Sequence, residues 1–208
     1  MNSARFVVTG TDTGIGKTIF AAALAQAIGA SYWKPIQAGL EDGSDSQTVA
    51  AIGGVPPARI LPEAWRLATP ASPHLAAEID GVTIDPVALE PPEVAGPLVI
   101  EGAGGLMVPI DRRTLMIDLF ARWGLPVILC ARTTLGTINH SLLSLAALKA
   151  RGMRVHGIAF VGEAHADNEA TIAAMSGVRA LGRLSIAELT PTGLAAAFAE
   201  GFDVGDFQ

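Results

Sequence analysis

Apolar residues in this chain form short uninterrupted runs, each followed by a glycine-rich segment or by a stretch rich in alanine and leucine. The run at residues 5–9 ends at Gly10 and leads into an apolar stretch from Lys17 to Ile28, which predicts a strand, a loop and a helix. Further strands are predicted at residues 98–100, 126–130 and 155–160, and further helices at 115–123 and 141–150. The strands lack alternating polar positions, so helices should cover both of their faces. The pattern predicts an α/β, doubly wound fold with a mainly parallel sheet.

The stretch between Ile52 and Pro97 differs because prolines interrupt it at nine positions: 56, 57, 62, 70, 73, 86, 91, 92 and 97. These prolines oppose regular elements except for a helix over residues 72–79. We interpret the stretch as long surface connections, and in open α/β folds such loops at the carboxyl ends of strands build the functional site. Nothing here indicates a boundary or a repeat, so residues 1–208 are predicted to form a single domain.

Composition narrows the class of protein. Hydrophobic residues make up 50% of the chain and charged residues only 16%, which excludes a disordered chain. The formal net charge of -6 disfavours nucleic acid and anionic membranes as partners. The single cysteine, Cys130, cannot form an intrachain disulfide, and no apolar run reaches the roughly 18 residues of a membrane span or resembles a signal peptide. A soluble, cytoplasmic protein is expected.

The strongest chemical signal lies between the first predicted strand and the first predicted helix, where residues 10–18 read Gly-Thr-Asp-Thr-Gly-Ile-Gly-Lys-Thr. In a P-loop, backbone N–H groups surround phosphate oxygens, the lysine reaches the β- and γ-phosphates, and the threonine binds Mg²⁺. Five residues, rather than the usual four, separate the first glycine from the last. The motif predicts a fold of the P-loop NTPase type that binds ATP or another nucleoside triphosphate. The predicted nucleotide-binding residues are Gly14, Ile15, Gly16, Lys17, Thr18 and Ile19.

Further short segments follow this loop in a fixed order. They are Tyr32-Trp33-Lys34-Pro35, Ser44-Asp45, Thr69-Pro70-Ala71-Ser72-Pro73-His74, Glu101-Gly102-Ala103-Gly104-Gly105 and Leu135-Gly136-Thr137-Ile138-Asn139-His140. With the loop, this ordered set resembles dethiobiotin synthetase from residue 6 to about residue 157. The resemblance implies an ATP- and Mg²⁺-dependent ligase of biotin biosynthesis, a homodimer that closes the ureido ring of dethiobiotin from 7,8-diaminononanoate and CO₂.

The implied reaction passes through two activated species. One substrate amine takes up CO₂ as a carbamate, whose oxygen attacks the γ-phosphoryl group to give a carbamic-phosphoric anhydride, and the second amine then closes the ring. Because carbamate and triphosphate are both anionic, fixed cations must compensate their approach. By resemblance, the catalytic residues are Lys34, Lys17 and Thr13, with Lys34 contacting the carbamate and the γ-phosphate.

The resemblance also assigns metal and phosphate ligands. Thr18, Asp45 and Glu101 resemble the family's magnesium ligands, and hard oxygen donors suit Mg²⁺. Asp42 is a neighbouring candidate for the second carboxylate, and a helix cap explains either acid about as well. The small residues after Glu101, which are Gly102, Ala103 and Gly104, are expected to form a glycine-rich loop that lets phosphate approach the backbone.

Substrate contacts are implied at two places. Lys34 and Ala38 follow the second strand, and residues 136–139 precede the helix predicted at 141–150. In the family, this helix start receives the substrate carboxylate from the neighbouring subunit, which assigns Gly136, Thr137, Ile138 and Asn139; for Asn139 a helix cap is an alternative. The helix itself carries small residues and leucines on more than one face, so it can meet a second copy as well as the sheet. Packing wholly within its own subunit remains the alternative.

Three departures from the family's pattern bear on chemistry. Gly14 stands where some relatives carry a glutamate, and Ala38 where a serine often contacts substrate. Val161-Gly162 replaces an Asn-Asp pair that reads adenine, which predicts weak discrimination between bases, although backbone groups near Gly182 to Ile186 could still read the ring.

Three other functions fit the sequence less well. The main alternative is a P-loop switch ATPase of the partitioning or assembly type, but such proteins carry an extra lysine early in the loop, where this chain has Asp12. A glutamine-dependent amide ligase would need an amidotransferase domain that 208 residues cannot hold. A nonenzymatic nucleotide-binding regulator would leave Lys34, Asp45 and Glu101 without a role.

Overall fold

The computed structural model describes residues 4–185 and 188–208. The strands are β1 (Arg5–Gly10), β2 (Ser31–Trp33), β3 (Ile36–Ala38), β4 (Trp65–Leu67), β5 (Leu98–Gly105), β6 (Val127–Arg132), β7 (Val155–Val161) and β8 (Ala180–Leu184). The helices are α1 (Lys17–Ala27), α2 (Asp45–Gly53), α3 (Pro73–Ile79), α4 (Met116–Trp123), α5 (Thr137–Ala150), α6 (Ala166–Ser176) and α7 (Pro191–Gly201). Short 3-10 turns lie at Pro57–Arg59 and Val204–Phe207.

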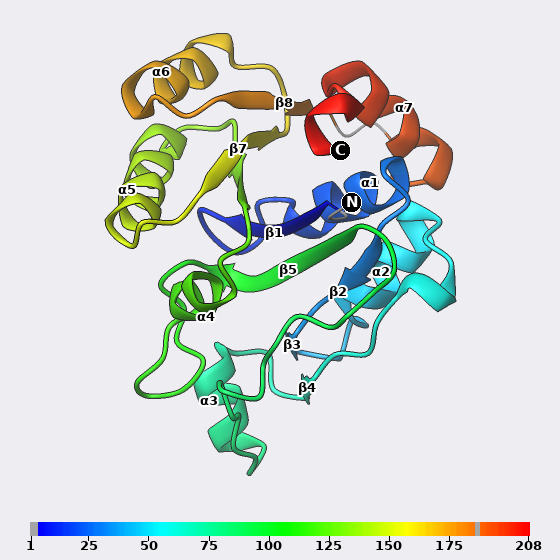
Figure 1. Cartoon of the computed structure of the whole chain (residues 1–208), viewed down its shortest axis with the longest axis vertical. Coiled ribbons are helices and arrows are strands. Elements are labelled where there is room, and N and C mark those ends of the chain that lie inside the picture. Colours follow the sequence, from blue (N-terminus) through cyan, green and yellow to red (C-terminus); the bar gives the residue numbers. More distant parts are fainter. Residues whose placement is uncertain (1–3, 186–187) are drawn as a thin grey trace.

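The main sheet has six strands in the order β2-β5-β1-β6-β7-β8, and all of its pairings are parallel. Helices α1, α2 and α7 cover one face, and α4, α5 and α6 cover the other (Figure 1). The central strand β1 pairs with β5 on one side and β6 on the other. The predicted α/β, doubly wound architecture is therefore confirmed, and the carboxyl ends of β1, β5 and β6 meet at one edge.

Each face of the sheet packs against its own hydrophobic core. Along β1, Phe6 and Val8 belong to the core under α1 and α7, while Val7 belongs to the core under α4 and α5. Val7 and Val8 are both fully buried, and burying a side chain of this size contributes about 1.5–3 kcal/mol. This double burial explains why the strand sequences lack polar alternation.

Two boundaries differ from the sequence prediction. Strand β5 does not end at Ile100 but continues through Gly105, which pairs with Gly10 after an irregularity in the register; the expected glycine-rich loop is strand. Helix α5 begins at Thr137 rather than Ser141, because Gly136 adopts a φ of 93° as its N-cap and the Thr137 hydroxyl bonds to the Arg132 carbonyl. Thr137, Ile138 and Asn139 therefore form the first helical turn instead of preceding it, and Asn139 is not the cap.

The proline-rich middle contains more structure than its composition predicted. The expected helix is present as α3, but the stretch also contains β4, which pairs in parallel with β3 from the preceding part of the chain as a two-stranded sheet. The Asp80 carboxylate accepts hydrogen bonds from the backbone N–H groups of Ala68 (2.6 Å) and Thr69 (3.3 Å) and from the Thr69 hydroxyl. These bonds fix the loop that leads from β4 to α3. Among the described helices, none is long and apolar enough to cross a bilayer.

Candidate active site

The loop between β1 and α1 has the backbone of an anion-binding turn. Gly14 and Gly16 adopt φ values of 70° and 92°, which side chains other than glycine rarely tolerate. A Cβ on Gly16 would also lie 2.5 Å from a methyl group of Val161 at the end of β7. The loop is anchored to β6, because the Thr11 N–H donates to the Cys130 carbonyl at 3.1 Å. The first N–H groups of α1 thus remain available to phosphate oxygens.

Lys17, the first residue of α1, lies folded over this loop. Its side chain is buried and its Nζ donates to the Asp12 carbonyl oxygen at 2.7 Å. Burial lowers the pKa of Lys17, and the negative charge of Glu101 opposes that shift. A bound phosphate would offset the cost of burying this ammonium group. The Ile15 side chain, by contrast, is buried in the core beside α1, and Ile19 packs partly buried against the same core.

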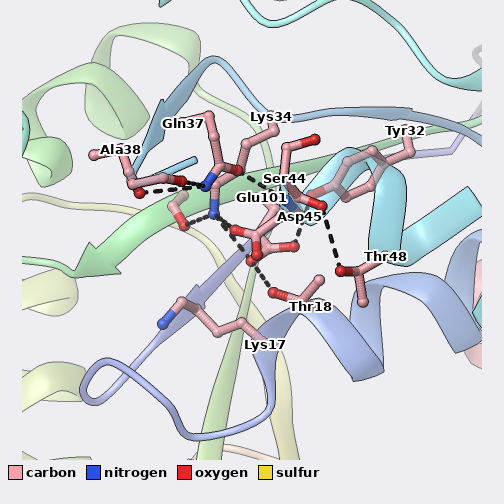
Figure 2. A network of polar contacts seen from close by, with 12 residues as sticks. Lys17, Thr18, Tyr32, Lys34, Gln37, Ala38, Ser44, Asp45, Thr48 and Glu101 are labelled. Atoms are coloured by element: carbon pink, nitrogen blue, oxygen red, sulfur yellow. Dashed lines mark hydrogen bonds and ion pairs between the residues drawn. The ribbon is translucent and has the colours of Figure 1, made fainter. Parts of the chain in front are cut away.

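Five polar residues converge where β5 passes the start of α1, and we call them the Glu101 cluster: Thr18, Tyr32, Lys34, Asp45 and Glu101 (Figure 2). Glu101 Oε1 accepts from the Thr18 hydroxyl at 2.8 Å and from Lys34 Nζ at 3.1 Å, and Oε2 accepts from the Tyr32 hydroxyl at 2.9 Å. Lys34 Nζ also contacts Asp45 Oδ2 at 2.6 Å and the Gly102 carbonyl at 3.2 Å. The cluster joins β2, β5, α1 and α2 through charged groups.

The neighbouring carboxylates explain why the ammonium group of Lys34 can be buried. Its side chain is 5% exposed and that of Glu101 is 1% exposed. Burial by itself would lower the pKa of Lys34, but the charges and hydrogen bonds of Glu101 and Asp45 outweigh it, so the pKa is raised. Lys34 therefore stays an ammonium ion, and with Lys17 it balances the two carboxylates of the cluster.

The structure distinguishes between the two candidate aspartates. Asp45 opens α2, whose cap is Ser44 in a capping box with Gln47, so neither aspartate is the helix cap. Asp45 points to Lys34, whereas Asp42 is exposed and takes part in none of the ion pairs found in residues 4–185 and 188–208. Asp45 is thus the carboxylate that lies with Glu101.

The donor set fits a magnesium ion. Thr18 supplies a hydroxyl, and Asp45 and Glu101 supply carboxylates, all of them hard oxygen donors. In the described part of the chain, no group of three or more His, Cys, Asp or Glu side chains is placed to hold a metal. Mg²⁺ does not require such a group, because it is commonly held by one or two carboxylates, water and substrate phosphates.

A cavity of about 440 Å³ opens beside the Glu101 cluster. Six predicted residues line it, namely Thr13, Lys34, Ala38, Asp45, Ala103 and Gly104. Gln37 and Ser72 line it as well, and sequence reasoning gave them no role. Gln37 accepts from the Asp45 N–H at 2.9 Å and donates to the Ala38 carbonyl at 3.3 Å, so it fixes the start of α2 against β3. Its position two residues after the Tyr32-Trp33-Lys34-Pro35 segment is the one signal in the sequence.

Two glycines on β5 are explained by packing. A Cβ on Gly102 would lie 2.6 Å from the Phe120 ring, and one on Gly104, at a φ of 66°, would lie 2.8 Å from a Val108 methyl and 3.5 Å from the Thr13 hydroxyl. A side chain at Gly102 would therefore collide with α4 and not with phosphate. Gly104 does border the cavity, which leaves its predicted role open.

The residues at the start of α5 do not reach the cavity within one chain. Gly136, Thr137, Ile138 and Asn139 are absent from its described lining, and Thr137 is buried against β6. Leu135, immediately before them, is 98% exposed. The geometry of one chain therefore leaves their predicted substrate contact untested.

At the end of β7, the residues offer few groups to a nucleobase. Val161 is buried against Gly16, and the Gly162 N–H donates to the Leu184 carbonyl at 3.0 Å. The Gly162 carbonyl accepts from Arg183 Nη1 at 3.3 Å. Ile186, the far end of the segment expected to read the base through its backbone, lies outside the described residues.

The parallel sheet, the loop and the two buried lysines define a protein of the P-loop nucleotide-binding class. Residues 4–191 match the family model described as "AAA domain". A ParA family ATPase from Chlorobium tepidum superposes with a TM-score of 0.54 at 12% identity, covering 95% of this chain and 91% of that one. The MinC:MinD complex of Aquifex aeolicus gives a TM-score of 0.52 at 11% identity, covering 94% and 86%. At these identities the likeness concerns the fold alone.

Curated relatives give the particular family. The chain is 62% identical to an ATP-dependent dethiobiotin synthetase BioD of Rhodopseudomonas palustris over 99% of this chain and 97% of the relative. Proteins of the same name from Sphingopyxis alaskensis, at 62% identity over 98% and 99%, and Agrobacterium fabrum, at 60% over 99% and 97%, match equally well. The chain belongs to the ATP-dependent dethiobiotin synthetase family. It is a ligase of biotin biosynthesis, as the motif resemblance predicted, and a switch ATPase is not favoured.

Proposed function

We propose that this chain closes the ureido ring of dethiobiotin from 7,8-diaminononanoate, CO₂ and ATP, with the reaction centred on Lys34. The observation that supports this most directly is the Lys34 ammonium group, held between Glu101 and Asp45 at the wall of the cavity and close to the P-loop lysine. This placement allows one cation to face both an anionic substrate in the cavity and the triphosphate on the loop. Thr13 also lines this cavity.

The chemistry has two bond-forming stages. An amine of the substrate adds to CO₂ and loses a proton, and an oxygen of the resulting carbamate attacks the γ-phosphorus while ADP leaves. The second amine then attacks the carbamate carbon, inorganic phosphate leaves, and the ring closes. Each stage brings anions together, so the fixed charges of Lys17 and Lys34 lower the barrier chiefly through positioning and electrostatics.

Thr18, Asp45 and Glu101 would hold the magnesium ion, which supplies further positive charge to the triphosphate when bound. These three side chains come from α1, α2 and β5, so the fold and not a single loop sets their separation. Oε1 of Glu101, which already accepts from Thr18, is the carboxylate oxygen turned toward the P-loop helix.

The substrate's carbon chain suits the cavity wall, which includes apolar surface from Ile36, Pro70 and Val108. Its carboxylate would extend to residues 136–139 of a second copy, so we also propose a homodimer. Three large apolar side chains support such a contact because they are exposed: Leu135, Leu143 and Met107. Leu143 and Met107 border one shallow depression that also includes Asp12 of the P-loop, so a partner seated there would lie against the nucleotide loop.

Phosphate release tests the reaction. With ATP and Mg²⁺ present, release should require both bicarbonate and 7,8-diaminononanoate, and dethiobiotin should form in equal amount. The variants Lys17→Ala and Thr18→Val should lose this activity while keeping the fold, since a lost charged contact in the transition state costs about 3 kcal/mol or more. Release that proceeds at the same rate without the diamine, or wild-type turnover by Lys17→Ala, would contradict the proposal.

A further inference from the structure

The chain contains one tyrosine, and it lies inside the molecule next to Glu101. Tyr32 is fully buried on β2, where it pairs with Val99 of β5. Its hydroxyl donates to Oε2 of Glu101 at 2.9 Å. Tyr32 does not belong to the described lining of the cavity, so it does not border the substrate space.

The two oxygens of Glu101 have separate partners. Oε1 meets Thr18 and Lys34, the groups that face nucleotide and substrate. Among the described residues, Tyr32 is the only hydrogen-bond donor to Oε2. Figure 2 shows Tyr32 reaching the carboxylate from β2, on the side away from Lys17. In this arrangement the tyrosine hydroxyl occupies Oε2, while Oε1 faces Thr18 and Lys34.

We propose that Tyr32 is a positioning residue that holds Glu101 in the one orientation from which Oε1 serves the magnesium-nucleotide complex. The proposal rests on the metal role given to Glu101 above. A glutamate side chain has several rotamers of similar energy, and a buried hydrogen bond to its charged end selects one of them. Without the phenol, the carboxylate of Glu101 would lack a donor on Oε2 while remaining buried, so it would turn or draw in water.

Tyr32 suits this role because its ring is fully buried and its hydroxyl is aimed at the Glu101 carboxylate. A phenylalanine at this position would keep the ring and remove the donor alone.

The first test measures metal affinity, not turnover. Mn²⁺ binding to the complex of Tyr32→Phe with a non-hydrolysable ATP analogue, followed by electron paramagnetic resonance, should weaken about tenfold, which corresponds to ~1.4 kcal/mol. Trp33→Phe is the matched control, because it removes an aromatic N–H that donates to the Pro62 carbonyl at 3.1 Å from the same strand. Its Mn²⁺ affinity should stay within twofold of wild type. Equal affinity of Tyr32→Phe and wild type would overturn the proposal.

The single tyrosine also provides a spectroscopic test. Protein labelled with 3-fluorotyrosine should give one ¹⁹F resonance, and that resonance should shift when Mg²⁺ is added to the complex with the ATP analogue. The shift should be lost in Glu101→Gln, because the carboxylate that links the metal to the phenol is then gone. An unmoved resonance in the labelled wild-type protein would refute the coupling between Tyr32 and the metal.

Glu101→Gln separates the two proposals. If this variant binds Mn²⁺ as wild type does, the metal role of Glu101 is wrong and the role of Tyr32 falls with it. If Glu101→Gln loses Mn²⁺ but Tyr32→Phe does not, the metal site stands and only the positioning role is refuted. Thermal unfolding of each variant confirms that the comparison is made on folded protein.

Discussion

Lys34→Met is the most informative change at this site, because it removes a buried charge while keeping most of the side-chain volume. The ammonium group contacts Asp45 at 2.6 Å, Glu101 at 3.1 Å and the Gly102 carbonyl at 3.2 Å. Its loss leaves two carboxylates close together without their shared cation. We therefore expect effects on both stability and catalysis that can be measured separately.

The structure sets the size of each effect. Removing one partner of a buried ion pair costs about 3–5 kcal/mol. Glu101 keeps its bonds from Thr18 and Tyr32, and the Asp45 side chain is 32% exposed, so water compensates part of the loss. We expect the free energy of unfolding to fall by about 3 kcal/mol. A similar loss of transition-state stabilisation lowers single-turnover ring closure at least about 100-fold.

The pH dependence gives an independent check. Because the pKa of Lys34 in the folded chain is raised above its ordinary value of 10.5, its stabilising contribution is fully present below that value. The contribution is lost as the pH rises through the raised pKa. The stability difference between wild type and Lys34→Met should therefore be constant at neutral pH and shrink in strongly alkaline solution.

Denaturant unfolding, nucleotide binding and single-turnover assays measure the three quantities. Nucleotide affinity should change little, and the double variant Lys34→Met/Asp45→Asn should regain stability without regaining turnover. An unchanged free energy of unfolding would refute the account of the ion pairs. If nucleotide binding collapses while single-turnover chemistry survives, Lys34 serves the triphosphate alone.

Three further outcomes are expected. Burial lowers the pKa of Lys17, and bound phosphates should raise it. Calorimetry at alkaline pH should therefore show that nucleotide binding takes up protons and weakens as the pH rises, and a Lys17→Met control should show neither effect. Because Val161 and Gly162 offer no polar side chain to the base, CTP and GTP should support turnover comparably to ATP, and a hundredfold preference for ATP in competition would contradict this. In the homodimer, mixing Lys17→Ala chains with inactive Asn139→Asp chains should restore activity, because each mixed dimer contains one site built from two intact halves. Random pairing then gives up to about half of one active site per dimer, whereas free subunit exchange without recovery of activity would refute the shared site.

The P-loop and the order of elements could be predicted because both are determined locally. Uninterrupted apolar runs such as Val7-Val8 indicate a strand that is buried on both faces. The spacing of Gly16, Lys17 and Thr18 identifies the P-loop wherever it stands between a strand and a helix. The sequence pattern predicts the start of α5 at Ser141, four residues late, because the positive φ of Gly136 cannot be read from a sequence in which many glycines have other roles.

The contacts of the cluster depend on strand order, which no local pattern specifies. Tyr32 and Glu101 are 69 positions apart and meet only because β2 lies beside β5 in the sheet. Tyr32 is an aromatic residue in a short apolar run, and nothing in that run distinguishes it from a core residue. Likewise, Gly102 is explained by the ring of Phe120, a neighbour that the sequence places on a different element.

The contact between Gly16 and Val161 limits how nucleotide preference can be redesigned. Val161 lies at the position that the family resemblance associates with reading the base, and here it supports the phosphate loop, with a methyl group 2.5 Å from where a Cβ of Gly16 would lie. A larger or polar replacement at Val161 would press on the turn that holds the triphosphate. Gly162 is no easier to replace, because it adopts a φ of 125° and a Cβ there would lie 2.9 Å from the Thr133 hydroxyl. Engineering for ATP selectivity should therefore leave both residues unchanged.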